Sequence, residues 1–284
     1  MKRHKTIIKP MAAMLYTAIL LLVIASTCLA GAWTASKNEL YDRLSFNYYY
    51  SNEEFNADGD RSGYLHNGKF RDLNLGNYLE YGLTDRLTLI NSLYYKYIVK
   101  EDDLRKDETY GLGDIDLALK WKALEGNLGV LSAQTLVKIP DAYDKDELLP
   151  LGNGQYDLEL RVLYGRSLYP LVPGYYNVEL GYRFRFEDPS DEIRYIAEFG
   201  MDFTQNFYGR IKLDGLYSMD NGEHRDDTGN PTATNNFDIG KLDMAAGYKI
   251  TKTWGLEIGC TPAIYGQTTS RGITYTAAVF FRVP

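Results

Sequence analysis

The chain has 284 residues, with 31 lysines and arginines against 38 aspartates and glutamates, which gives a formal net charge of −7. This acidic balance argues against nucleic-acid binding, because nucleic-acid phosphates attract cationic proteins. The mean hydropathy is negative, and no run of 18 or more apolar residues follows the N-terminal region, so a helical membrane protein is excluded.

The first 32 residues have the order of an export signal. Four basic residues come first, Lys2, Arg3, Lys5 and Lys9. An apolar run over about 11–25 and small residues up to Ala32 follow, as in a secretory signal peptide. We therefore expect 1–32 to be cleaved and 33–284 to form the mature protein. Acylation of Cys28, as in a lipoprotein, is the alternative, but Ala25, Ser26 and Thr27 make a poor lipidation site.

Cleavage would remove four basic residues and no acidic one, which moves the net charge from −7 to −11. Cys260 would be the one cysteine left, so an internal disulfide framework is ruled out. The remaining length, about 250 residues without a break in composition, predicts one domain.

From about residue 40 to the end, apolar and polar residues alternate in about twelve stretches of roughly 11 to 14 residues. In 176–186, for example, aromatic and aliphatic residues alternate with Asn177, Glu179, Gly181, Arg183 and Arg185. A period of two sends successive side chains to opposite faces of a strand. Each stretch is long enough to cross a bilayer, whereas strands of a soluble sandwich usually have about 5 or 6 residues. We predict an all-β fold, an antiparallel up-and-down transmembrane β-barrel of about 12 strands.

The connectors alternate in length. Long and mostly acidic connectors are expected at 51–68, 101–109, 140–152, 187–192, 220–236 and 266–271. Short links are expected at 84–86, 124–127, 169–174, 205–206 and 251–254. This order predicts an outer-membrane barrel with long outer loops, short periplasmic turns and both termini in the periplasm. Aromatic residues gather near both kinds of connector, as the two membrane interfaces favour, although aromatic residues also favour strands in any β protein.

Charged residues cannot face lipid cheaply, so the polar phase of the strands is expected to line the lumen. The lumen candidates are Asp114, Asp116, Lys120, Lys122, Asp157, Glu159, Arg161, Glu179, Arg183, Arg185, Glu198, Asp202, Arg210 and Lys212. Two interpretations stay open. The charges could select ions along a polar path, or they could pair across the lumen and fill it.

Two segments resemble signatures of the phenol-degradation meta-pathway outer-membrane family. The first, GLGDIDLALKW, resembles its G-x-G-D-x-x-L-x-x-K motif through Gly111, Gly113, Asp114, Leu117 and Lys120. The second, GNGQYDLELRVLY, resembles a glycine-rich motif through Gly152, Gly154, Asp157 and Leu160. Both lie where an outer loop enters a strand. The resemblance implies a transporter-like outer-membrane barrel, with aromatic or hydrophobic compounds as solutes.

We therefore expect a channel or transporter-like barrel for small solutes in the bacterial outer membrane. The expected partners are membrane lipid, lipopolysaccharide and the barrel assembly machinery, and the sequence indicates no cofactor, metal or catalytic residue. A non-conducting structural or adhesive barrel is one alternative. An outer-membrane lipid-modifying enzyme is another, although the mature histidines, His66 and His224, both fall in expected outer loops.

Overall fold

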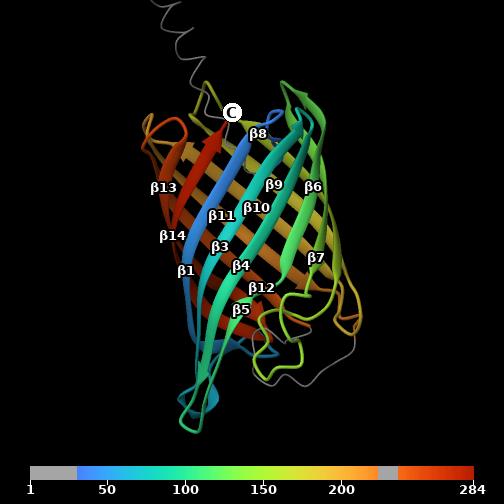
Figure 1. The fold of residues 1–284 in the computed structure, drawn as a ribbon, viewed down its shortest axis with the longest axis vertical. Helices are drawn as coiled ribbons and strands as arrows, with labels where there is room; N and C mark the ends of the chain where they lie inside the picture. The colour runs from blue at the N-terminus through green and yellow to red at the C-terminus, as the bar shows by residue number, and fades with distance from the viewer. Residues whose placement is uncertain (1–30, 223–235) are drawn as a thin grey trace, which may run out of the picture. The chain divides into compact units, whose positions relative to one another are not determined.

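A computed structural model describes residues 31–222 and 236–284. Twelve of its strands pair antiparallel, each with its neighbours in the chain, and the last pairs with the first to close a barrel (Figure 1). The sequence prediction of an all-β barrel of about twelve strands is confirmed. The signal-peptide prediction for 1–32 falls almost entirely outside the described residues and stays a prediction.

The twelve wall strands are β1 (Leu40–Phe55), β3 (Lys69–Thr84), β4 (Leu87–Glu101), β6 (Ile115–Gly126), β7 (Gly129–Ile139), β8 (Asp157–Ser167), β9 (Gly174–Arg185), β10 (Glu192–Asp202), β11 (Phe207–Ser218), β12 (Asp238–Lys249), β13 (Trp254–Gln267) and β14 (Thr269–Val283). Two further strands are β2 (Arg61–Gly63), which pairs with β1, and β5 (Lys106–Leu112), which pairs with β4. A short 3-10 helix, η1 (Leu65–Asn67), follows β2.

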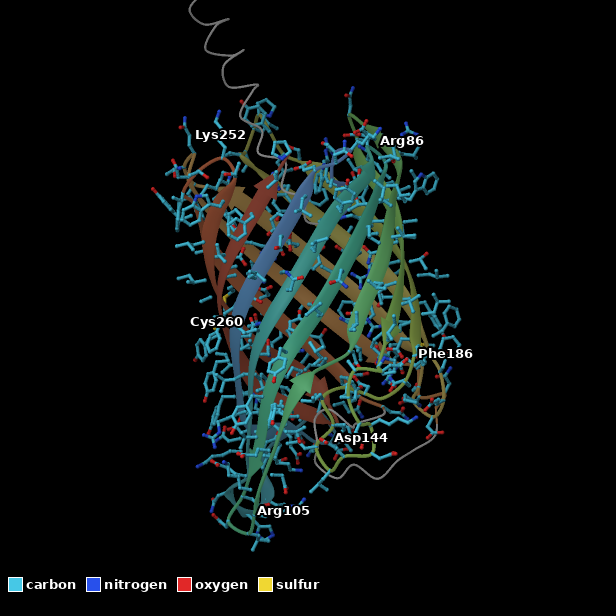
Figure 2. All side chains as sticks on the ribbon, in the orientation of Figure 1. Arg86, Arg105, Asp144, Phe186, Lys252 and Cys260 are labelled. Atoms are coloured by element: carbon cyan, nitrogen blue, oxygen red, sulfur yellow. The ribbon has the colours of Figure 1, made fainter. Side chains whose placement is uncertain are left out.

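The barrel has its apolar side chains outside and its polar side chains inside. On β6, for instance, Leu119 and Trp121 are 46% and 52% exposed, whereas Lys120 between them is 1% exposed. Alternation along each strand repeats this arrangement around the wall, and the side chains that project outward are visible in Figure 2. An apolar outer surface on a closed sheet is stable in lipid, because the closed sheet leaves no strand edge unpaired. The protein is therefore an outer-membrane barrel. Among the described residues, no helix is long and apolar enough to cross a membrane.

The two ends of the barrel differ. The short turns next to Arg86 and Lys252 lie at one end together with the C-terminus, and Arg105 and Asp144 lie at the opposite end (Figures 1 and 2). We call these the periplasmic end and the outer end, following the topology of such barrels.

The predicted connector at 266–271 is wrong. Only Thr268, with a positive φ of 52°, separates β13 from β14. Pairing with β1 extends the strand: Thr269 lies opposite Phe55, and Arg271 forms an ion pair with Glu53. A polar run that resembles a loop in the sequence thus becomes strand because its neighbour supplies the partners.

The connectors at 51–68 and 101–109 are shorter as loops than expected. β1 continues to Phe55, and β4 and β5 form a hairpin beyond the barrel rim. β4 pairs with β6 in its periplasmic half and with β5 in its outer half, and Gly113 N–H donates to Tyr94 O at 2.9 Å where the pairing changes. β5 and β6 are therefore one strand interrupted by a bulge at 113–114.

Candidate functional site: the barrel lumen

The structure places the fourteen lumen candidates on the inner phase of the strands. Their neighbours in sequence, such as Leu117, Leu160 and Leu180, are exposed on the outer face. Two candidates lie near the periplasmic end: Lys122 pairs with Glu125 at 2.6 Å, and Asp202 pairs with Lys249 at 2.7 Å. Three more lie elsewhere: Lys120 pairs with Glu80 at 3.3 Å, Lys212 pairs with Asp214 at 3.8 Å, and Asp116 lies on β6. The other nine form three connected groups.

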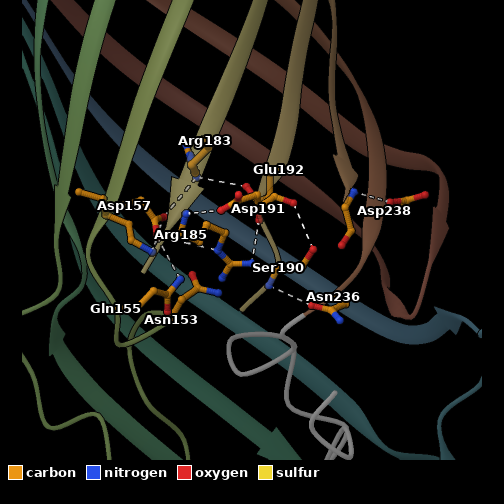
Figure 3. Close-up of polar contacts among 12 residues, drawn as sticks. Asn153, Gln155, Asp157, Arg183, Arg185, Ser190, Asp191, Glu192, Asn236 and Asp238 are labelled. Atoms are coloured by element: carbon orange, nitrogen blue, oxygen red, sulfur yellow. Dashed lines mark hydrogen bonds and ion pairs between the residues drawn. The ribbon is translucent and has the colours of Figure 1, made fainter. Parts of the chain in front are cut away.

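The first group joins β7, β8, β9 and β10 in the outer half of the lumen (Figure 3). Lys138 Nζ lies 2.8 Å from Asp157 and 3.8 Å from Asp114. Arg185 lies 3.0 Å from Glu192 and 3.9 Å from Asp157. Asp157 is 1% exposed, so this group is dry, and each charge there depends on its partners because water cannot replace them.

The second group lies beside the first, toward the middle of the wall. Glu159 is 0% exposed and accepts from Arg183 at 2.8 Å and from Arg161 at 2.5 Å. Arg161 also reaches Glu179 at 2.6 Å. The two arginines thus share Glu159 and lock β8 to β9 through side chains as well as through the backbone ladder.

The third group lies in the periplasmic half on the far wall. Glu257 of β13 accepts from Arg43 at 2.7 Å and from Arg210 at 3.2 Å, and Arg210 also lies 3.6 Å from Glu198. Aromatic rings surround this group. Tyr208 donates to Glu257 at 3.0 Å, and its ring packs on Phe280.

The wall formed by β10, β11 and β12 is wetter than the wall of the second group. Asp214 is 29% exposed, and it pairs with Arg194 at 3.3 Å and Lys212 at 3.8 Å. Lys241, which lies opposite Asp214 in the β11–β12 register, is exposed. Since these side chains are on the inner phase, their accessible surface faces space inside the barrel along this wall.

The outer mouth is narrowed by the connector between β7 and β8, here called the outer loop (residues 140–156). Leu149 and Leu151 are 2% and 3% exposed because they pack inward against Phe70 of β3 and Ile98 of β4. Lys96 Nζ donates to Leu151 O at 3.0 Å. The outer loop therefore folds into the mouth and does not extend away from it.

The two family-like motifs meet at the base of the outer loop. A Cβ on Gly152 would lie 2.3 Å from Asp114 Oδ1, and a Cβ on Gly113 would lie 3.1 Å from Leu151 O. Gly154 adopts a positive φ of 78°, which favours glycine. The glycines thus let the backbones of the two motifs approach each other closely. The two motifs also share one cation, since Lys138 pairs with both Asp114 and Asp157.

Tyr143 fastens the outer loop. Its hydroxyl donates to Asp114 at 2.6 Å and accepts from Gly154 N–H at 2.8 Å. Burial and the hydrogen bond to the Asp114 carboxylate both raise the pKa of Tyr143 well above its usual range. The hydroxyl therefore stays protonated, and remains a donor, throughout the physiological range.

The periplasmic end is narrowed by the segment that precedes β1, here called the inner segment (residues 31–36). Ala32 is 0% exposed; its N–H donates to Asn177 at 3.0 Å, and its carbonyl accepts from Ser132 at 2.5 Å. Further along the segment, Ala35 N–H donates to Thr88 at 2.9 Å. These partners belong to β4, β7 and β9, so the segment crosses the lumen near one part of the wall.

Lys120, the motif lysine, holds the start of the inner segment. Its ammonium donates to Gly31 O at 3.1 Å and pairs with Glu80 at 3.3 Å. Of the remaining motif residues, Gly111 lies in β5, and Leu117 and Leu160 are 40% and 49% exposed on the outer face. The two leucines therefore contact lipid and do not line the lumen.

Several lumen residues were missed from the sequence. The period-two pattern could have found three of them, because they lie on the same phase as lumen candidates in their own or the neighbouring strand: Arg43, Lys241 and Asp243. The sequence pattern predicts a connector that includes Glu192, but Glu192 is the first residue of β10. Nothing in the local pattern indicates the inner segment, because its partners come from strands about 50 to 145 residues away.

No group of three or more metal-ligating side chains occurs in the described part of the chain. His66 lies in η1, in the connector between β1 and β3, and is exposed. His224 lies outside the described residues. Cys260 is a free, half-buried thiol on β13.

No protein-family model and no curated protein matches this sequence. Solved structures do match its fold. The COG4313 outer-membrane channel from Pseudomonas putida F1 is 16% identical and has a TM-score of 0.70, over 89% of this chain and 98% of that one. The NanC porin is 8% identical, with a TM-score of 0.54 over 85% of this chain and 100% of that one. The chain thus shares the fold of outer-membrane channels and porins, and the resemblance to the phenol-degradation family stays a prediction.

Proposed function

We propose that the protein is an outer-membrane channel that passes small solutes through the barrel lumen. The observation that carries the proposal is the less tightly packed wall of β10, β11 and β12, where Asp214 and Lys241 keep accessible surface on the inner face of a closed barrel. Accessible inner surface on this wall beside dry ion-pair groups supports a narrow polar path displaced to one side of the lumen.

The resemblance to the phenol-degradation family suggests aromatic or hydrophobic compounds as solutes. Aromatic side chains on the inner face support this choice. Tyr94 of β4 is 41% exposed on the inner phase, and Trp33 of the inner segment packs edge-on against Tyr175 with ring centroids 5.7 Å apart. Rings of this kind offer stacking surfaces to an aromatic solute.

Single-channel recording in planar bilayers tests the channel. We expect stable conductance steps from the purified full-length protein, together with uptake of phenol by proteoliposomes at a higher rate than by empty liposomes. Silence in the bilayer and uptake equal to that of empty liposomes would instead favour a non-conducting barrel, held shut by the ion-pair groups of β6–β10.

A further inference from the structure

Lys241 differs from the other cations on the inner face of the barrel wall. It lies on β12, where it is flanked in the register by Asp214 of β11 and Ala263 of β13. The next residues along the strand, Leu242 and Met244, belong to the opposite, outer phase. The Lys241 side chain therefore points into the outer half of the lumen, where the residue keeps accessible surface.

Other inner cations of the wall have a carboxylate within 4.0 Å. This holds for Arg43, Lys96, Lys120, Lys122, Lys138, Arg161, Arg183, Arg185, Arg194, Arg210, Lys212 and Lys249. Lys241 forms no such ion pair with the residues that the structure describes. Asp214, the acid opposite it, is already shared by Arg194 and Lys212.

The surroundings of Lys241 carry an excess of positive charge. Arg194, Lys212 and Lys96 all repel it, and Asp214 attracts it. Lys96 belongs to β4, on the other side of the barrel, so positive charge faces Lys241 across the lumen. Asp72 is held by Lys96 at 3.5 Å and Asp243 by Lys212 at 3.4 Å. A solute that brings one negative charge would complete the pairing.

We propose that Lys241 binds the carboxylate of a small aromatic acid as that solute passes through the lumen. A single carboxylate matches the single unpaired ammonium, whereas a doubly charged anion would be repelled by Asp214. The aromatic part is argued from Tyr94, which is exposed on the inner face of β4 two residues from Lys96 and so offers a ring on the wall across the lumen from Lys241. The proposal rests on the channel function, since it names the solute class that the same lumen takes.

Equilibrium binding tests the site without requiring conduction. Isothermal titration of the full-length protein in detergent, with benzoate as the probe, should show saturable binding that Lys241→Met weakens by about tenfold, equivalent to about 1.4 kcal/mol. Lys241→Arg should retain binding because it keeps the charge. Lys249→Met, which removes an ion-paired lysine at the periplasmic end, should change benzoate binding by less than about twofold.

Two further probes test separately whether the carboxylate and the aromatic ring of the ligand contribute to binding. Benzyl alcohol, which lacks the charge, should bind at least about tenfold more weakly than benzoate to the wild type. Acetate, which lacks the ring, should bind more weakly than benzoate, and Tyr94→Ala should reduce this difference. Equal benzoate affinity in the wild type and Lys241→Met would overturn the proposal, as would equal affinity for benzoate and benzyl alcohol.

Folding and conduction are measured separately. A barrel that folds migrates faster on an unheated denaturing gel than after boiling, which shows whether each variant is folded; Lys241→Gln replaces Lys241→Met if the latter fails this test. Benzoate binding without conductance would keep the site and reject the channel. Conductance without benzoate binding would keep the channel and reject the site.

Discussion

The Lys138 ammonium lies 2.8 Å from the Asp157 carboxylate, and the two groups are 7% and 1% exposed. Asp157 begins β8 and Lys138 lies near the end of β7, so the pair spans the base of the outer loop. Asp114, in the bulge before β6, approaches the same ammonium at 3.8 Å. One lysine thus joins the two segments that resemble family motifs.

Lys138→Met should destabilise the barrel strongly. The substitution removes the closest counter-charge of the buried Asp157, which keeps only Arg183 and Arg185 at 3.8 and 3.9 Å, and it removes the ion pair of Asp114. Breaking a buried ion pair by removing one partner typically costs about 3–5 kcal/mol. Denaturant unfolding of the protein in lipid vesicles, followed by circular dichroism, measures the change. Lys145→Met is the matched control, because Lys145 pairs with Glu187 at 3.7 Å while both are more than half exposed; it should cost at most about 0.5 kcal/mol. Equal effects would show that the Lys138 group is not a structural anchor.

Tyr143→Phe should release the outer loop. It removes the hydroxyl that donates to Asp114 and accepts from Gly154, a loss of about 1–3 kcal/mol in local stability. Trypsin should then cut after the exposed Lys145 faster than in the wild type, which mass spectrometry of the digest would detect. Tyr156→Phe serves as the control on the same loop, since the Tyr156 hydroxyl bonds Asp141 at the exposed surface. An unchanged cleavage rate in Tyr143→Phe would contradict the fastening role.

Ser132→Ala combined with Asn177→Ala should loosen the inner segment. The two side chains supply hydrogen bonds to the backbone of Ala32, and both come from the lumen wall. If the segment narrows the path, single-channel conductance should rise by about twofold or more, with added current noise. Thr135→Ala, an exposed position on β7, should leave conductance unchanged. Conductance equal to that of the wild type would show that the inner segment does not narrow the solute path.

Asp191→Asn should reveal a pH-dependent contribution from the connector between β9 and β10. Burial raises the pKa of Asp191, but hydrogen bonds from Arg185 N–H at 2.9 Å and the Tyr182 hydroxyl at 2.8 Å outweigh it, so the pKa lies below its usual range. The carboxylate therefore stabilises the folded state above its unfolded pKa of about 3.9, and this contribution disappears as pH falls through the lower folded pKa.

We expect Asp191→Asn to cost about 1 kcal/mol at pH 7 and progressively less below about pH 4. Urea unfolding at a series of pH values measures this difference. A difference between the variant and the wild type that stays constant down to pH 2 would show that the charge of Asp191 does not contribute.

Period two in the sequence determined the strands, their number and the face of each side chain. Trp121 had to face lipid and Lys120 the lumen, because a charge at mid-depth on the lipid face costs a few kcal/mol. The same alternation places Lys241 on the inner phase, although the sequence pattern does not single it out. The polar stretch at 266–271 resembles a loop in the sequence, but pairing with β1 makes it strand.

Only the tertiary structure decided which charges pair and which stay wet. Lys138 meets Asp114 and Asp157 because the outer loop folds inward, and Ala32 meets Asn177 across 145 positions of sequence. Period two fixes the face of a side chain but not its neighbours across the lumen, since those depend on how the closed sheet curves and on where loops enter it. That is why Lys120 and Lys241, two inward lysines in the same kind of local pattern, differ: one is buried against Glu80, and the other is exposed without a carboxylate partner among the described residues.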